Sequence, residues 1–307
     1  MTLHQLLTEG TEQLKNAGNP EAQLDARRLL LEAFQIDMVH FLMDRMQQLP
    51  QNVTVQRALN DYRDMIKKRC QRKPIQHILG SQEFMGLTFW VNSHVLIPRQ
   101  DTETLVEQVL MEQALSKETT REKKVLDLCT GSGCIAISLM EKGRFSHMVA
   151  TDLSWEALLV AQENAKRLLT GQGEDGKELI FCQGDLFKAL ESGMKFDILV
   201  SNPPYIPTDI IKELQPEVRD HEPVMALDGA KDGLEFYRRI ASEAREWLQA
   251  GASVYLEIGY DQGREVCELL EKQGFQNIKI VKDLSGLDRV VRADYLSVER
   301  GKEESYV

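Results

Sequence analysis

Residues 125–136 read VLDLCTGSGCIA, the pattern of a buried strand, a glycine-rich turn and the start of a helix. Glycine lets the backbone approach a ligand closely, and the first turn of a helix presents unpaired N–H groups. The turn lacks the Gly-x-Gly-x-x-Gly spacing of a dinucleotide site. The segment therefore indicates an α/β fold with a small-molecule site, but it does not name the ligand.

Strand and helix patterns alternate from Asp101 onward, which is the signature of a doubly wound α/β sheet. We predict seven strands, mostly parallel, near 124–129, 147–151, 178–182, 196–201, 252–258, 276–282 and 289–296. Helices are expected between them, including 154–169 and 233–249. The segment GQGEDGK at 171–177 reads as a surface loop.

The first 80 residues differ from the rest because they are helical and poor in strand patterns. Apolar residues recur at helical spacing in three segments, 3–14, 21–34 and 53–70. Alternating side chains between 83 and 97, with a turn at Asn92-Ser93, predict a β-hairpin. We therefore expect an N-terminal helical bundle at 1–80, a hairpin linker at 81–98 and an α/β domain at 99–307.

The charge of the chain is acidic and unevenly distributed. The 307 residues are 42% hydrophobic and 28% charged, as in an ordinary soluble globular protein, and the net charge is −11. That charge disfavours tight, sequence-independent binding to nucleic acid. Residues 1–80 carry 11 Lys and Arg against 9 Asp and Glu. The basic run from Arg63 to Lys73 is the candidate polyanion contact, although such a run is more often the solvated end of a helix.

The cysteines and the N-terminus bear on cellular location. Five cysteines are scattered without a Cys-x-x-Cys pair: Cys70, Cys129, Cys134, Cys182 and Cys267. This pattern argues against a disulfide framework or a structural zinc site and for a reducing compartment. No stretch has the apolar length of a membrane span, and the first ten residues lack the layout of a signal peptide. We expect a cytoplasmic protein without membrane association.

A second site motif, Asn202-Pro203-Pro204-Tyr205, follows the apolar run FDILVS. Two consecutive prolines cannot continue a sheet, so the chain leaves it rigidly at the carboxyl end of a strand, where α/β folds bind ligands. The Asn202 amide oxygen, the Pro203 carbonyl and the Tyr205 ring suit a planar NH2 group. The motif indicates chemistry at an amide or exocyclic amino nitrogen, with these three residues as catalytic candidates and all four as substrate-binding candidates.

Acidic residues end three successive strands of the expected sheet. Asp152 is suited to ribose hydroxyls, Asp185 to an adenine amino group, and Asp127 to an ammonium group, directly or through water. Each acid alone is equally well explained as a helix cap or surface residue. Together with the tetrapeptide they favour S-adenosylmethionine, a cationic methyl donor, over an anionic dinucleotide. The expected cofactor-binding residues are Asp127, Cys129, Thr130, Gly131, Ser132, Gly133, Asp152, Asp185, Leu186 and Asn202.

Taken together, the motifs resemble the release factor glutamine methyltransferases, a family of class I S-adenosylmethionine-dependent enzymes. The further matching segments are PIQHILG (74–80), LIPRQDTE (96–103), EVRDHEP (217–223), ALDG (226–229), DGL (232–234) and KDLSGLDRVV (282–291). The resemblance implies a Rossmann-like methyltransferase domain, a helical domain that recognises substrate, and methylation of the glutamine N5 in the Gly-Gly-Gln motif of peptide chain release factors. The chain departs from the family pattern at Cys129 (usually glycine), Gln100 (commonly proline) and Leu186 (aromatic in some relatives).

Two other interpretations remain open. An amino methyltransferase of DNA or RNA, acting on adenine N6 or cytosine N4, shares the tetrapeptide. Such an enzyme must extrude its base and hold phosphates, which a net charge of −11 does not favour. The second is a non-catalytic cofactor-binding or interaction protein, which the intact tetrapeptide together with the three acids disfavours. We therefore expect release factors as partners and no stable binding of nucleic acid.

Overall fold

The computed structural model describes residues 1–115, 123–145, 147–169 and 178–296, which form two compact units. The first unit comprises Met1–Ser81 together with Leu214–Glu222, and the second comprises the rest. A segment from the α/β half of the sequence therefore belongs to the helical unit. The loop predicted at 171–177 lies outside the described residues.

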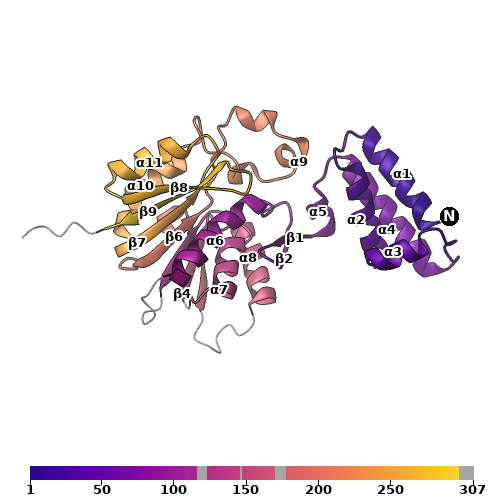
Figure 1. Ribbon diagram of the computed structural model, residues 1–307, viewed down its shortest axis with the longest axis horizontal. Helices are drawn as coiled ribbons and strands as arrows, with labels where there is room; N and C mark the ends of the chain where they lie inside the picture. Colours follow the sequence, from indigo (N-terminus) through magenta and orange to yellow (C-terminus); the bar gives the residue numbers. More distant parts are fainter. Residues whose placement is uncertain (116–122, 146, 170–177, 297–307) are drawn as a thin grey trace, which may run out of the picture. The chain divides into compact units, whose positions relative to one another are not determined.

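The first unit is a bundle of helices around a leucine-rich core (Figure 1). Its helices are α1 Leu3–Asn16, α2 Ala22–Phe34, α3 Met38–Asp44, α4 Val53–Cys70, α5 Ile75–Leu79 and the short α9 Pro216–Arg219. Thr2 begins α1 with a capping box, because its hydroxyl accepts from the Gln5 N–H at 3.2 Å and the Gln5 side chain accepts from the Thr2 N–H at 2.8 Å. The three long helices match the segments predicted from sequence, whereas α3 was not predicted.

The hairpin differs from its prediction in register. It pairs β1 Ser81–Phe84 with β2 Leu87–Trp90 through the turn Met85-Gly86, whose φ angles are 51° and 72°. A turn does lie at the predicted place, where the Val95 N–H donates to the Asn92 carbonyl at 3.4 Å, but it is not the hairpin turn, because 91–97 is not a strand. The apolar alternation there arises because Val91 and Val95 of an irregular segment are buried against α8 (Trp155–Leu168).

The second unit is built on the predicted seven-stranded sheet, with the order β5-β4-β3-β6-β7-β9-β8. The strands are β3 Lys124–Leu128, β4 His147–Asp152, β5 Glu178–Gln183, β6 Phe196–Ser201, β7 Leu248–Glu257, β8 Gln276–Lys282 and β9 Asp288–Tyr295. The pairs from β5 to β7 are parallel, and β9 runs antiparallel to both of its neighbours. The prediction of a mostly parallel α/β sheet is confirmed.

The helix predicted at 233–249 is longer than the helix in the structure. α10 covers Glu235–Glu243, a 3₁₀ turn follows at Ala244–Glu246, and β7 has already begun at Leu248. The predicted helix to residue 249 is therefore wrong at its end. Parallel pairing of Leu248 with Phe196 overrides the helical propensity of the local sequence.

Helices cover both faces of the sheet (Figure 1). Successive side chains of a strand point to opposite faces, so Val125 lies in one core and Leu126 in the other. The first core also contains residues of α6 (Gln100–Leu115), α7 (Cys134–Lys142) and α8, and the second contains residues of α10 and α11 (Gly263–Lys272). Burial on both faces explains why the central strands β3, β4 and β6 read as nearly continuous apolar runs.

Candidate active site

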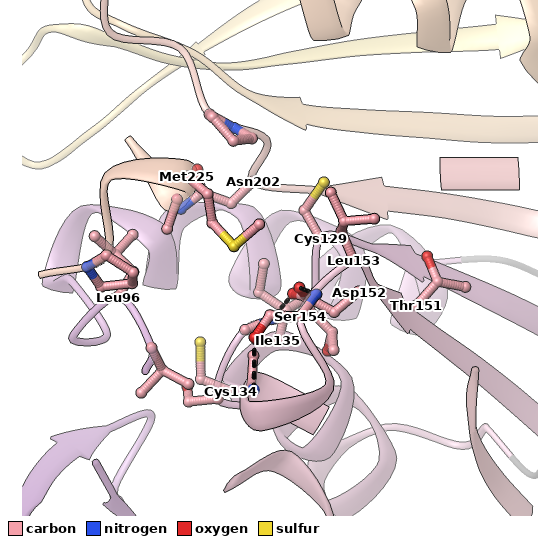
Figure 2. Close-up of a pocket in the computed structure, with 18 of the residues that line it drawn as sticks. Leu96, Cys129, Cys134, Ile135, Thr151, Asp152, Leu153, Ser154, Asn202 and Met225 are labelled. Carbon is pink, nitrogen blue, oxygen red and sulfur yellow. Dashed lines mark hydrogen bonds between the residues drawn. The ribbon is translucent and has the colours of Figure 1, made fainter. Parts of the chain in front are cut away.

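A cavity of about 320 Å³ lies where the central parallel strands end. β3 lies between β4 and β6, so the chain order reverses beside it, the place where open α/β sheets bind ligands. The predicted site residues that line the cavity are Cys129, Thr130, Gly131, Ser132, Asp152, Asp185, Leu186, Asn202 and Pro204. In Figure 2, Asn202 and Met225 lie on one side of this cavity, and Asp152 and Ser154 lie on another.

The glycine-rich turn is fastened to the next strand through Asp152. One Asp152 carboxylate oxygen accepts from the Gly131 N–H at 2.8 Å and the other accepts from the Ser154 N–H at 2.9 Å. Burial raises the pKa of Asp152, although these backbone hydrogen bonds oppose the shift. Gly131 has a φ of 56°, and a Cβ there would meet no atom within 4 Å. The turn therefore leaves open space and carboxylate lone pairs beside the cavity.

Asp127 lies beneath the turn and is fully buried. Its Oδ2 accepts from the Thr130 hydroxyl at 2.6 Å, while its Oδ1 has no hydrogen-bond partner. Burial raises the pKa of Asp127 to about 7. An unpartnered buried carboxylate oxygen is costly unless a ligand satisfies it, so this atom suits a cationic group. Neither Asp127 nor Gly133 lines the cavity.

Asp185 lines the cavity, and its carboxylate is paired with two basic side chains. Its Oδ1 accepts from Arg239 Nη2 at 2.6 Å and its Oδ2 from Lys188 Nζ at 3.0 Å. The hydrogen bond from Arg239 lowers the pKa of Asp185. This carboxylate is therefore more engaged than the sequence analysis expected, and Arg239 is a neighbour of the site that the sequence did not indicate.

Asn202 reaches the cavity at the end of β6. Its Nδ2 donates to the Thr102 hydroxyl at 3.3 Å, so its Oδ1 is the amide atom available as an acceptor. Pro204 lines the cavity beside it, whereas Pro203 is buried and does not. Thr102 itself is buried and lines the cavity from α6.

Tyr205 does not line the cavity, and its hydroxyl donates to Glu257 Oε1 at 3.4 Å. The Tyr205 carbonyl accepts from Gln262 Nε2 at 3.0 Å. A Cβ on Gly233 would lie 2.3 Å from the same carbonyl oxygen, so only glycine fits there. The end of the tetrapeptide is thus held by three residues that the sequence analysis did not assign to the site. For Glu257 a signal existed, since an acid ends an apolar strand, as at Asp152.

The basic run from Arg63 to Lys73 is not a uniform cationic surface. Arg69 is buried and donates to Asp25 Oδ2 at 2.7 Å and to Glu217 Oε1 at 2.8 Å. Arg72 also binds Glu217, with Nε and Nη2 at 2.8 and 2.7 Å. Two of the six cations therefore hold the bundle and α9 together.

The described ranges contain no helix that is both long and apolar enough to cross a membrane. Within the same ranges, no three or more His, Cys, Asp or Glu side chains gather as metal ligands. All five cysteines are free thiols.

Both parts of the chain match known protein families. Residues 5–80 match the family described as the PrmC N-terminal domain, and residues 102–213 match the methyltransferase small domain. The release factor glutamine methyltransferase of Clostridium acetobutylicum is 39% identical over 295 residues, which cover 95% of this chain and 98% of that protein. The protein of the same name from Geobacter sulfurreducens is 38% identical over 94% of this chain and 95% of its own length.

Among solved structures, the catalytic domain of hMettl16 in complex with MAT2A 3′UTR hairpin 6 aligns with a TM-score of 0.52. The alignment covers 77% of this chain and 83% of that chain at 15% sequence identity. At this identity the likeness shows a shared fold only.

Proposed function

The chain belongs to the release factor glutamine methyltransferase family, and from that premise we propose its reaction in full. It transfers a methyl group from S-adenosylmethionine to the side-chain amide nitrogen, N5, of the glutamine in the Gly-Gly-Gln motif of peptide chain release factors. The observation that carries the proposal is the Asn202 amide at the cavity, with Nδ2 engaged by Thr102 and Oδ1 available to a substrate N–H.

The residues around the cavity fit S-adenosylmethionine. Asp127 lies beneath the cavity wall without lining it, so its unpartnered Oδ1 suits the ammonium group through a water. The Asp152 oxygens accept backbone N–H groups from Gly131 and Ser154 and retain lone pairs for ribose hydroxyls. The open space at Gly131 allows close approach to the backbone. When bound, this molecule supplies an electrophilic methyl group.

A glutamine amide nitrogen is a poor nucleophile because its lone pair is delocalised into the carbonyl. Asn202 Oδ1 and the Pro203 carbonyl would accept its two N–H groups, hold its plane and direct the lone pair toward the methyl group. The same two oxygens stabilise the positive charge that develops on nitrogen. No general base is required before transfer, because the proton can leave to water afterwards.

The role of Tyr205 is revised from the one expected from sequence. Its hydroxyl is engaged by Glu257 and its ring lies in the core that contains α10 and α11. We therefore assign Tyr205 to supporting the tetrapeptide rather than to direct contact with the substrate amide.

We further propose that the helical unit provides a second contact for the release factor and that the protein acts in the cytoplasm, where ribosomes terminate translation. We do not expect the protein to bind nucleic acid stably. The net charge is −11, and Arg69 and Arg72 of the basic run are already paired with carboxylates.

The test is to incubate purified release factor with this protein and S-adenosylmethionine and to map the added methyl group by peptide mass. A gain of one methyl on the Gly-Gly-Gln glutamine is expected. A release factor with that glutamine replaced by alanine serves as the control and should gain none. Methylation only of DNA or RNA, offered in a parallel reaction, would establish the nucleic-acid alternative instead.

A further inference from the structure

We propose that Thr102 and Glu257 are positioning residues of this site, and that a directed chain of hydrogen bonds from Glu257 through Thr102 sets which end of the Asn202 amide faces the substrate. The inference rests on the proposed function only for the identity of that substrate. The orientation of Asn202 itself is a property of the free protein and can be measured without turnover.

The direction of the chain follows from the donors that each group has. Asn202 Nδ2 donates to Thr102 Oγ1 at 3.3 Å, and the Thr102 hydroxyl is in turn a hydrogen-bond partner of the Glu257 carboxylate. A hydroxyl has a single proton, and an ionised carboxylate can only accept. Thr102 must therefore give its proton to Glu257 and receive one from Asn202, which turns the Asn202 oxygen to the cavity.

The same carboxylate also holds the other end of the tetrapeptide. Tyr205 donates its hydroxyl to Glu257 Oε1 at 3.4 Å, and the second oxygen, Oε2, has no hydrogen-bond partner. Glu257 is only 1% exposed. A buried and partly unsatisfied carboxylate is a poor device for stability, and a hydrophobic or amide side chain would serve the core better. Its presence at the end of β7 is explained by its hydrogen bonds, which hold Asn202 through Thr102 and hold Tyr205 directly.

Protonation of Glu257 would remove this direction. Burial raises the pKa of Glu257 to about 7. Five charged or titratable groups face the Glu257 carboxylate: Arg289 of β9, Asp101 of α6, Tyr205 after β6, Cys134 of α7 and Tyr237 of α10. The Tyr237 hydroxyl donates to the Glu257 backbone carbonyl at 2.8 Å. Once protonated, Glu257 can donate to Thr102, which then can donate to Asn202 Oδ1. The amide would turn its NH2 group toward the substrate, where it repels the substrate N–H groups.

The kinetic experiment uses Thr102→Val and Thr102→Ser with the release factor as substrate and saturating S-adenosylmethionine. Val keeps the shape of Thr but removes the hydroxyl, so kcat should fall about tenfold or more, while Ser should recover it to within about threefold. Thr88→Val, at an exposed position of β2 in the same unit, is the matched control and should leave kcat unchanged.

The pH dependence of kcat is a second readout, which would not change in the variants if Glu257 had a purely structural role. In the wild type, kcat should rise as the pH passes about 7, and this step should be absent in Glu257→Gln. Asp127 has a pKa in the same range, but its effect should fall on the KM for S-adenosylmethionine rather than on kcat. Saturating cofactor therefore separates the two groups.

The orientation of Asn202 can be followed directly by NMR on protein labelled with ¹⁵N-asparagine. The chain has only eight asparagines, and the Asn202 side-chain signal is the one lost in Asn202→Ala. This signal should titrate near pH 7 in the wild type and stop titrating in Glu257→Gln and in Thr102→Val. An unchanged titration in both variants, or an unchanged kcat in Thr102→Val, overturns the inference. Absence of methylation by the wild type would instead overturn the proposed function, and the NMR result alone would then decide the inference.

Discussion

Glu217 and Arg69 are 148 residues apart in the sequence, and Glu217 Oε1 accepts a hydrogen bond of 2.8 Å from Arg69 Nη1. Arg69 also donates to Asp25, and Arg72 donates to both Glu217 oxygens. The four side chains are buried or nearly so. A charged cluster, rather than apolar packing alone, therefore holds α9 in the helical unit.

The segment that this cluster holds is continuous at both ends with the second unit. The segment Leu214–Glu222 leaves the second unit after Glu213 and returns at Pro223, which lines the cavity.

Glu217→Gln should lower the free energy of unfolding of the helical unit by about 2–3 kcal/mol at pH 7, because it removes the carboxylate from a largely buried ion cluster. Urea denaturation followed by circular dichroism would measure this. Asp220→Asn is the matched control, since Asp220 is exposed and pairs with its neighbour Arg219. The control should change stability by less than about 0.5 kcal/mol. Equal stability of Glu217→Gln and the wild type would show that the cluster contributes nothing.

Glu217 should also make the stability of the fold depend on pH in the acid range. Burial alone would raise the pKa of Glu217, but hydrogen bonds from Arg72 and Arg69 outweigh it and hold the pKa at about 2. A carboxyl with a lowered pKa in the folded state stabilises the fold fully above its unfolded pKa, near 4.5, and this stabilisation is lost as the pH falls toward 2. The wild type should lose stability over this range more steeply than Glu217→Gln.

Cys129 adopts a φ of 61° at the first position of the glycine-rich turn, a conformation that costs a residue with a Cβ about 1 kcal/mol. Cys129→Gly should therefore keep or slightly raise the free energy of unfolding, whereas the β-branched Cys129→Val should lower it by about 2 kcal/mol. Thermal denaturation of the two variants would test the order. A Val variant as stable as the Gly variant would contradict the strained backbone.

Asp152→Ala should weaken S-adenosylmethionine binding about tenfold to a hundredfold, because a hydrogen bond to a charged group contributes about 1.5–3 kcal/mol. Isothermal titration calorimetry would measure the affinity, with Asp261→Asn at an exposed position after β7 as the control. Unchanged affinity would exclude Asp152 from the ribose site.

Because of Asp127 and Glu257, the fold should lose stability as the pH rises from acidic values to about 7. Burial raises the pKa of each to about 7, so between about pH 4.5 and 7 the folded state retains protons that the unfolded chain has lost. The free energy of unfolding should fall as the pH rises through this window, by about 3–4 kcal/mol for each group. Urea midpoints at pH 5 and pH 8 should differ less in Glu257→Gln than in the wild type; an identical difference would mean that Glu257 does not titrate there.

The sheet and the cavity wall were predictable because their signals are local. A strand buried on both faces is a continuous apolar run, and the acids and the Asn-Pro-Pro-Tyr turn follow such runs directly. The contacts of Glu217 with Arg69 and of Thr102 with Asn202 were not predictable, because each joins segments distant in sequence. The hairpin turn at Met85-Gly86 was missed for a different reason, since a methionine at positive φ carries none of the usual turn signals.

Asn202→Ala provides the most direct test of the amide site. Removing an acceptor that stabilises developing charge should lower kcat for release factor methylation by about 10²–10³-fold. Asn202 also lines the cavity, so S-adenosylmethionine affinity is expected to weaken only modestly, and the melting temperature should stay close to that of the wild type. Asn60→Ala, at an exposed position of α4, is the control and should retain full turnover.

Asn202→Asp adds a sharper comparison, because aspartate keeps an acceptor oxygen but has no NH2 group to donate to Thr102. If an acceptor alone were sufficient, Asn202→Asp would retain activity; if Thr102 must hold the amide by its NH2 group, Asn202→Asp should be nearly as inactive as Asn202→Ala. Near-normal turnover in Asn202→Ala would remove this residue from the mechanism altogether.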